Sequence, residues 1–203
     1  MSWAISDIHL SPGMRWTLDM RDKGPLVIDG DTFNLLPYGL KEWETPEGMA
    51  TVQSVVDLTQ DAVWISGNHD PLNWLRPLLV RAGVGPSRVV RSLDVDGHHF
   101  EHGHRFAGDW AILRYIAPSV VEWLTTNPLT RKWWYQFCVD RGWIASDFPH
   151  SSERYDRFVS VTWGFASLDA DRNHRTNVIG HTHCRASWDN LIDLGSNELV
   201  EVI

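Results

Sequence analysis

The chain has 203 residues, of which 43% are hydrophobic and 22% charged, a composition typical of one globular domain over residues 1–203. Its formal net charge of -8 argues against a general binder of nucleic acid or anionic membranes, because both attract basic proteins. No apolar run is long enough to span a membrane, and the opening MSWAIS lacks a secretory leader pattern, so we expect a cytoplasmic protein. The two cysteines, Cys138 and Cys184, lack the spacing of a thiolate metal site.

Three short apolar runs in the first half of the chain predict buried strands. They cover residues 3–5, 25–28 and 62–65, and each ends in a polar loop that contains aspartate, asparagine or histidine. Apolar runs of this length are typical of strands that are covered on both faces.

Two helices are predicted between and after these strands. Thr45 followed by Pro46 is typical of a helix start, and apolar residues then recur at helical spacing, which predicts a helix over residues 45–60. Residues 71–82 predict a second helix, which ends at Gly83. The alternation of strands and helices indicates the α/β class.

The second half of the chain begins and ends with strand patterns. Residues 89–93 and 98–102 predict two strands, separated by the hairpin dipeptide Asp96-Gly97. Between them and the C-terminal strands, residues 105–177 show helical periodicity and hold 14 of the 23 aromatic residues, which predicts a helical insertion, or lid. The C-terminal strands are predicted at residues 177–179, 190–194 and 199–203.

Polar blocks rich in aspartate and histidine follow five of the predicted strands. Two such side chains at positions i and i+2 can converge on one ion, and neighbouring strand ends in an α/β sheet bring several loops together. Each block alone has an ordinary explanation as a turn or a hydrogen-bonded core histidine. The blocks are Asp7-x-His9, Gly30-Asp31, Gly67-Asn68-His69-Asp70, His102-Gly103-His104 and Gly180-His181-Thr182-His183.

The third block admits two interpretations. Asp70 can orient His69 or raise its pKa, which would let the imidazole protonate a leaving oxygen. Alternatively, Asp70 is only the N-cap of the helix predicted over residues 71–82.

The five blocks in this order resemble the calcineurin-like metallophosphoesterase superfamily over nearly the whole chain. The resemblance implies a four-layer α/β/β/α sandwich, in which two packed sheets flanked by helices hold two divalent ions at the sheet ends. The turn at Leu194-Gly195-Ser196 also looks like the strand and turn that follow the last block in the family.

The resemblance assigns a role to most residues of the blocks. It implies His69 as the general acid, supported by Asp70, and His104 as a contact either for the metal ligands or for substrate phosphate. Mixed nitrogen and oxygen donors suit Mn, Fe, Zn, Co or Ni better than Mg or Ca, and among these five we expect Mn. The implied metal ligands are Asp7, His9 and His183 for one ion and Asn68, His102 and His181 for the other, with Asp31 as the bridge between them.

The chain departs from the family pattern at two points. Asn34 stands where many members carry an acid, so we expect altered support of the site and no loss of metal. The helical insertion resembles that of UDP-2,3-diacylglucosamine pyrophosphohydrolases, but those enzymes tend to have arginine at the position of His69 and aspartate at that of His104.

We expect a phosphodiesterase or pyrophosphohydrolase that acts on a small phosphorylated substrate, linked to a nucleotide or a lipid. The insertion contains Trp133, Trp134 and further aromatics beside basic residues, which could hold bases or acyl chains and contact a membrane, or only pack on one another. Arg154 and Arg157 could reach a diphosphate or be solvated. The alternatives are a phosphomonoesterase and a non-catalytic metal-binding scaffold.

Overall fold

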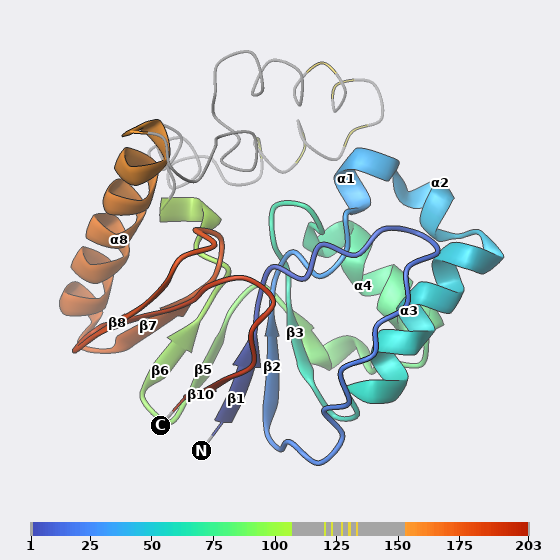
Figure 1. Cartoon of the computed structure of the whole chain (residues 1–203), viewed down its shortest axis with the longest axis horizontal. Coiled ribbons are helices and arrows are strands. Elements are labelled where there is room, and N and C mark those ends of the chain that lie inside the picture. Colours follow the sequence, from blue (N-terminus) through green and yellow to red (C-terminus); the bar gives the residue numbers. More distant parts are fainter. Residues whose placement is uncertain are drawn as a thin grey trace.

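The structure is a computed structural model that describes residues 2–106 and 153–202, together with Val120, Trp123, Asn127, Thr130 and Trp133. The described residues form an α/β fold with two five-stranded mixed sheets and five helices (Figure 1). Among these helices, none is both long and apolar enough to cross a membrane.

The first sheet has the strand order β10-β1-β2-β3-β4. The four strands β1 to β4 run parallel to one another, and β10 pairs antiparallel with β1. The parallel strands therefore all end at the same edge of the sheet. The strands are β1 (Ser2–Ile5), β2 (Leu26–Asp29), β3 (Val63–Ile65), β4 (Val89–Val90) and β10 (Val200–Val202).

The second sheet has the order β5-β6-β7-β9-β8. The central strands β6, β7 and β9 are parallel, whereas β5 and β8 pair antiparallel at the two edges. The strands are β5 (Leu93–Val95), β6 (His98–Phe100), β7 (Thr176–Ile179), β8 (Arg185–Trp188) and β9 (Leu191–Leu194).

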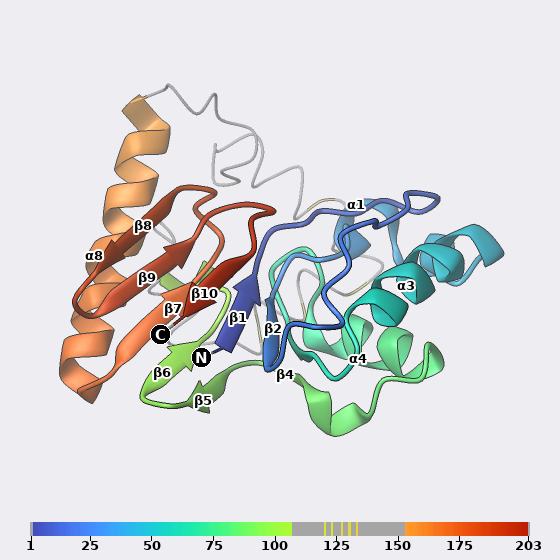
Figure 2. The ribbon, with the colours of Figure 1, turned by 60° about the horizontal axis from the view of Figure 1, so that its bottom comes forward.

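The helices lie on the two sides of this pair of sheets, as Figures 1 and 2 show. The longest helix, α8, runs along the second sheet, and the other four lie beside the first. The helices are α1 (Leu35–Tyr38), α2 (Leu40–Trp43), α3 (Pro46–Leu58), α4 (Leu72–Arg81) and α8 (Glu153–Asn173), with 3-10 turns η1 (Pro86–Arg88) and η2 (His104–Phe106).

Alternation along β2 shows how the layers pack. Ile28 belongs to an apolar cluster shared with α3 and α4, whereas the preceding Val27 belongs to a cluster that contains Phe100 and Val178 of the second sheet. A third cluster joins Ala166 of α8 to β7 and β9. Both faces of the first sheet are thus covered, which explains why its strands are continuous apolar runs.

Most predicted elements outside the insertion are confirmed. The helix predicted over residues 45–60 is α3, and the Thr45 side chain caps it by accepting the Gly48 N–H at 3.2 Å. The hairpin at Asp96-Gly97 joins β5 to β6, and its two residues have φ values of 49° and 81°. Positive φ at both central residues is what a tight hairpin turn requires.

Some predictions were wrong or incomplete. The single strand predicted at residues 89–93 is two strands, because β4 ends in the first sheet and β5 begins in the second. The short helices α1 and α2 and the edge strand β8 were missed, and β8 lacks an apolar pattern because most of its residues are exposed. Of the insertion predicted over residues 105–177, α8 is helical, β7 already begins at Thr176, and most of residues 107–152 lie outside the described part.

Candidate metal centre

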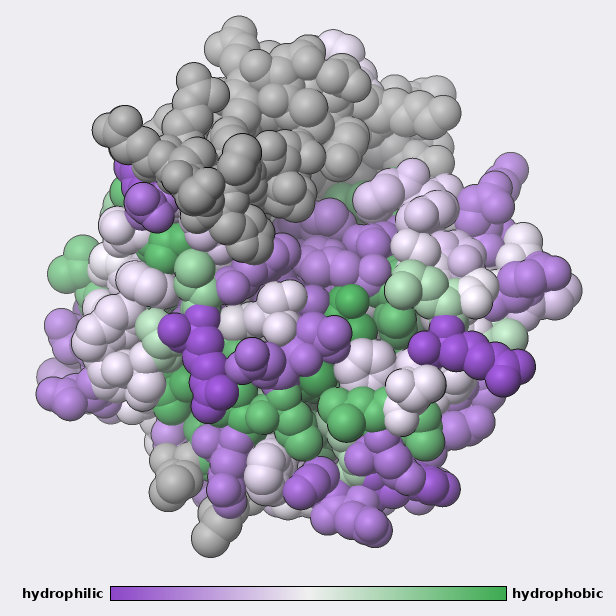
Figure 3. All heavy atoms as spheres, viewed as in Figure 1, coloured by the Kyte–Doolittle hydropathy of each residue, from purple (hydrophilic) through white to green (hydrophobic). Residues whose placement is uncertain are grey.

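The loops that follow β1, β2, β3, β6 and β7 meet at one end of the two sheets. These loops carry the five blocks of aspartate and histidine residues. Hydrophilic residues gather near the middle of the face that Figure 3 shows, at the level of these loops in Figure 1. The parallel arrangement of the strands is the reason that residues far apart in the chain converge here.

One group of side chains consists of Asp7, His9 and His183. Asp7 Oδ1 lies 3.2 Å from His183 Nε2 and 3.7 Å from His9 Nε2, and the two Nε2 atoms are 3.3 Å apart. These three atoms are close enough to bind one metal ion. The structure therefore brings together the three residues expected to bind the first ion.

A second group consists of Asp31, His102 and His181. Asp31 Oδ2 lies 3.1 Å from His102 Nε2, and Asn68 Oδ1 lies 3.2 Å from the same nitrogen. His102 Nδ1 donates to the carbonyl of Asp29 at 3.1 Å, which leaves Nε2 as the atom free to bind a metal. The residues expected around the second ion thus also lie together.

The two groups are adjacent, and the surroundings of the Asp7 carboxylate suit a bound cation. Asp7 Oδ1 is buried, has no hydrogen-bond donor, and lies within 4.0 Å of three histidine nitrogens, including His102 Nε2. Its other oxygen, Oδ2, accepts the Ser6 hydroxyl at 2.5 Å and the His181 N–H at 2.9 Å. A buried carboxylate oxygen without a donor is costly unless a cation binds it. The residues present therefore fit a metal centre.

Charges within the site point the same way. Burial would raise the pKa of Asp7 and of Asp31, but the neighbouring imidazoles outweigh burial and hold both pKa values below the ordinary value. Burial would lower the pKa of His102, but Asp31 and Asp7 raise it well above its ordinary value. The same balance raises the pKa of His9 to about 9. Two ionised carboxylates thus attract positive charge to this point.

The backbone of the site is strained. Nine non-glycine residues in the described part of the chain have positive φ, and five of them are expected ligands, with φ between 49° and 70°. Each such residue costs on the order of 1 kcal/mol or more, and strain of this kind concentrates at functional sites. The five residues are Asp7, His9, Asp31, His181 and His183.

Two glycines allow the loops to approach one another. A Cβ on Gly180 would overlap Ser6 Oγ and lie 2.6 Å from Asp7 Oδ2. A Cβ on Gly67 would overlap the carboxylate of Asp31. The glycines of two blocks are therefore required by close packing between loops of different strands.

Asn34 connects two histidines of the site. Its Oδ1 accepts from His9 Nδ1 at 3.1 Å and from His69 Nδ1 at 3.0 Å, while its Nδ2 donates to the His9 carbonyl at 2.8 Å. Because an amide oxygen only accepts, both rings carry a proton on Nδ1 and present Nε2 to the site. Asn34 was expected only to alter the support of the site, and the structure shows it as the shared partner of both rings.

His69 lies beside both groups. With His9 and Asp31 it forms a third set of possible ligands, and its ring meets that of His9 edge-on at 4.8 Å between centroids. Burial lowers the pKa of His69 below its ordinary value, so the interpretation in which Asp70 raises this pKa was wrong. His69 was expected only as an acid, and this position at the centre also makes it a possible ligand.

Asp70 has a different environment from the one expected. The residue that caps α4 is Pro71, which makes no side-chain cap hydrogen bond, so the prediction of an Asp70 cap was wrong. The Asp70 carboxylate instead accepts four backbone N–H groups at 2.7–3.2 Å, from Asp31, Thr32, Phe33 and Gly67. Burial and the charge of Asp31 raise its pKa to about 7, while the Gly67 and Phe33 N–H groups lower it. Asp70 supports His69 through the loop backbone, because the ring itself is bonded to Asn34.

The three residues expected to contact substrate differ in position. His104 lies near the second group, with its ring centroid 5.6 Å from that of His102 and 6.3 Å from that of His181. Arg157 on α8 is exposed. The side chain of Arg154 lies outside the described part, as do Trp134 and six other aromatics of the insertion.

Several residues near the centre were missed by the sequence analysis. Phe158 of α8 packs its ring edge-on against His181, with 5.5 Å between centroids, and the Tyr155 hydroxyl donates to the carbonyl of Thr182. Asp193 accepts the Thr182 hydroxyl at 2.5 Å. The sequence offered a signal only for Asp193, which is an acid inside the apolar run 191–194.

Neither a scan against protein-family models nor a search of curated proteins finds a match for this chain.

Proposed function

We propose that this protein is a dinuclear metal-dependent hydrolase of phosphate esters with the four-layer fold of the calcineurin-like metallophosphoesterases. The substrate we propose is a small phosphodiester or diphosphate, linked to a nucleotide or a lipid. The observation that carries the proposal is the adjacency of two groups of ligands, with Asp7 Oδ1 3.2 Å from His183 Nε2 and 4.0 Å from His102 Nε2. Carboxylates at this junction suit two divalent cations.

The residues of each group would hold one divalent ion. Asp7, His9 and His183 would bind the first, and Asn68, His102 and His181 would bind the second, with Asp31 between them. Two such ions supply a deprotonated water as nucleophile and neutralise charge on the phosphoryl oxygens. Imidazole, amide and carboxylate donors favour Mn, Fe, Zn, Co or Ni over Mg and Ca, and we place Mn first.

The other residues of the site would position groups and move a proton. In its doubly protonated form, His69 would keep the Nδ1 proton on Asn34 Oδ1, 3.0 Å away, and give the Nε2 proton to the leaving oxygen, which returns the ring to neutral. Asp31 Oδ1 accepts the His69 N–H at 2.7 Å, so the ligand and the acid share one loop contact. His104 would contact the phosphate.

Metal removal and replacement tests the proposal directly. The protein is stripped with a chelator, Mn²⁺ is added back, and hydrolysis of bis-p-nitrophenyl phosphate is compared with that of p-nitrophenyl phosphate. We expect Mn²⁺-dependent cleavage of the diester. In Asp31→Asn the rate of diester hydrolysis should fall by more than the 10- to 100-fold that is typical when a residue outside the ligand set is replaced. Asp61→Asn, at an exposed carboxylate, should hydrolyse the diester at the wild-type rate.

Each of the other outcomes would indicate a different function for this protein. Cleavage of the monoester alone would make it a phosphatase. Two bound ions without turnover on either ester would contradict the hydrolase and favour a metal-binding scaffold. Failure of the wild type to bind Mn²⁺, Fe²⁺, Zn²⁺, Co²⁺ or Ni²⁺ would overturn the whole proposal.

The role of His69 is tested with two leaving groups. General acids contribute about 10²- to 10⁴-fold, and their contribution is largest when the leaving oxygen is a poor leaving group. His69→Ala should therefore slow alkyl diesters more than p-nitrophenyl diesters. Equal losses on the two substrates would remove His69 from the acid role.

A further inference from the structure

The loop that carries His181 and His183 is short and strained. β7 ends at Ile179 and β8 begins at Arg185, so only five residues lie between the strands. His181 and His183 have φ values of 70° and 59°, which residues other than glycine rarely adopt. Such a loop keeps its shape only if neighbouring groups hold it.

Thr182, between the two histidines, makes the contacts that hold this loop. It is fully buried, and its hydroxyl donates to Asp193 Oδ2 at 2.5 Å while accepting the Cys184 N–H at 3.2 Å. Its carbonyl accepts the hydroxyl of Tyr155 on α8. Both the side chain and the backbone of Thr182 are therefore fixed from outside the loop.

Asp193 joins this loop to α8. It lies on β9, is fully buried, and accepts three donors: the Thr182 hydroxyl, the Trp163 indole N–H at 2.8 Å and the Gly195 N–H at 3.1 Å. The Thr182 and Trp163 donors meet the same carboxylate oxygen, Oδ2. A continuous chain of hydrogen bonds thus runs from α8 to the residue between the two histidines.

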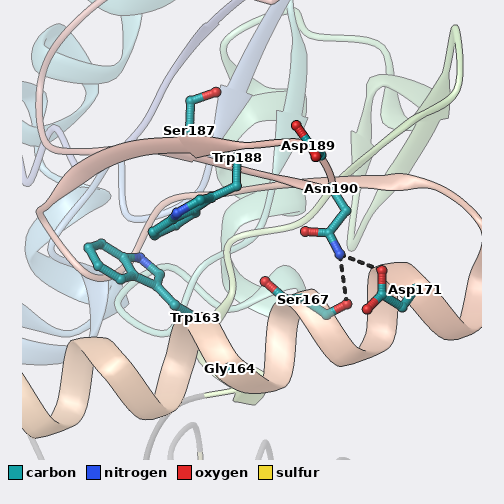
Figure 4. A pocket seen from close by; sticks show the side chains of 8 residues that line it. All are labelled: Trp163, Gly164, Ser167, Asp171, Ser187, Trp188, Asp189 and Asn190. Carbon is teal, nitrogen blue, oxygen red and sulfur yellow. Dashed lines mark hydrogen bonds between the residues drawn. The ribbon is translucent and has the colours of Figure 1, made fainter.

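The end of this chain on α8 is itself fixed to the β8–β9 hairpin, as Figure 4 shows. The Trp163 ring meets the Trp188 ring edge-on, with 4.7 Å between centroids. Further along the helix, Asn190 Nδ2 donates to the Ser167 carbonyl at 3.3 Å and to Asp171 Oδ1 at 2.6 Å. These contacts hold Trp163 in place without touching the metal centre.

We propose that Thr182, Asp193 and Trp163 are positioning residues that set the metal affinity of both ion sites by holding His181 and His183 against the loops of the first sheet. The inference rests on the proposed metal centre and extends it to residues outside the ligand set. Each group of ligands takes one histidine from this loop and at least two residues from other loops. Loss of the hydrogen-bond chain therefore weakens both sites and abolishes neither.

The test compares Thr182→Val with Thr182→Ser in the full chain. Valine keeps the shape of threonine and loses the hydroxyl, whereas serine keeps the hydroxyl. Mn²⁺ binding to chelator-stripped protein is measured by calorimetry. We expect Thr182→Val to weaken binding about 10- to 100-fold, as for other residues that orient metal ligands, and Thr182→Ser to remain within about threefold of the wild type.

A second variant tests the α8 end of the chain and covers a failure of Thr182→Val to fold. Trp163→Phe removes the indole N–H and keeps a smaller aromatic ring beside Trp188, so we expect the same loss of affinity to a smaller extent. With either variant, saturating Mn²⁺ should restore kcat for bis-p-nitrophenyl phosphate, because the ligands themselves are intact.

The outcomes separate this inference from the proposed function. If the wild type binds two Mn²⁺ ions and both variants bind them with wild-type affinity, the positioning role is wrong and the hydrolase proposal stands. If serine loses as much affinity as valine, the hydroxyl is irrelevant and the inference is also overturned. If the wild type binds no metal ion, the proposed function fails first.

Discussion

Two buried carboxylates, Asp70 and Asp193, hold the two halves of the candidate metal centre in different ways. Asp70 cross-links the loops after β2 and β3 of the first sheet, and all four of its donors are backbone N–H groups. Asp193 holds the loop after β7 of the second sheet, and two of its three donors are side chains, from Thr182 and Trp163. One clamp depends on a single side chain, and the other on at least three.

This difference shows how far the sequence around each half of the centre, the loops of the first sheet or the loop after β7, can change. Backbone donors exist whatever the sequence, so the Asp70 clamp is local and tolerates changes around it. The Asp193 clamp requires α8, whose Trp163 lies 30 residues away in the chain. The half of the centre that contains His181 and His183 therefore depends on a helix packed against the outside of the second sheet, and the other half does not.

Removing Asp70 should have the largest effect. Asp70→Ala leaves four N–H groups in a buried position without their acceptor, and each such group costs about 1–3 kcal/mol. We expect the free energy of unfolding to fall by about 4 kcal/mol or more, measured by urea denaturation, with loss of Mn²⁺ binding. Asp57→Ala, at an exposed residue of α3, is the matched control. A loss below about 1 kcal/mol would show that Asp70 is not the clamp of this half.

The contribution of Asp193 to the free energy of unfolding should depend on pH. Burial raises the pKa of Asp193 to about 7, although its three donors lower it. A raised pKa means that the folded protein favours the protonated carboxyl, so this contribution to stability is complete below pH 3.8 and is lost as pH rises to about 7. The unfolding free energy of the metal-free wild type should therefore fall relative to that of Asp193→Asn between pH 4 and 7, by a few kcal/mol at about 1.4 kcal/mol per pKa unit.

The comparison with the variant isolates Asp193, because other groups with shifted pKa values are common to both proteins. A constant difference between pH 4 and 7 would mean that Asp193 is ionised throughout this range. In that case the three hydrogen-bond donors to Asp193 outweigh the effect of burial on its pKa.

The comparison also shows what the sequence could predict. Asp7, Asp31 and His102 were found because ligands that follow parallel strands meet at one edge, a consequence of local pattern and sheet geometry. Trp163 was not found, because a hydrogen bond between α8 and β9 leaves no periodic signal in either segment. Asn34 was noticed only as a departure, since spacing does not show that one amide serves two rings.

The strands show the same limit. The apolar run at residues 89–93 predicts extended backbone correctly, but hydrophobicity does not show to which sheet each part belongs. The chain leaves the first sheet after Val90 and enters the second at Leu93. This crossing places β6, and therefore His102, opposite the loops of the first sheet.

Gly180 lies where the two halves meet, and its replacement should have an intermediate effect. In Gly180→Ala the new Cβ would overlap Ser6 Oγ and crowd Asp7, so the loops must separate. Overpacking of this kind costs about 1–3 kcal/mol of unfolding free energy, and Mn²⁺ affinity should fall with it. Gly24→Ala, where a Cβ meets no atom within 4 Å, is the control. Wild-type affinity in Gly180→Ala would show that the loops need not touch.

The smallest expected effect is a gain in stability. It distinguishes the effect of a stiffer α8 from the effect of the contacts that α8 makes. Gly164 lies in the middle of α8, next to Trp163, and a Cβ there would meet no atom within 4 Å. Alanine is favoured over glycine inside a helix by about 0.5–1 kcal/mol, so Gly164→Ala should stabilise the protein by that amount in thermal or urea unfolding. Mn²⁺ affinity should stay within about threefold of the wild type, because the hydrogen bonds of Trp163, Asp193 and Thr182 are unchanged. A larger rise in affinity would mean that the flexibility of α8 limits the second half of the centre, and that the contacts at its end are not the whole clamp.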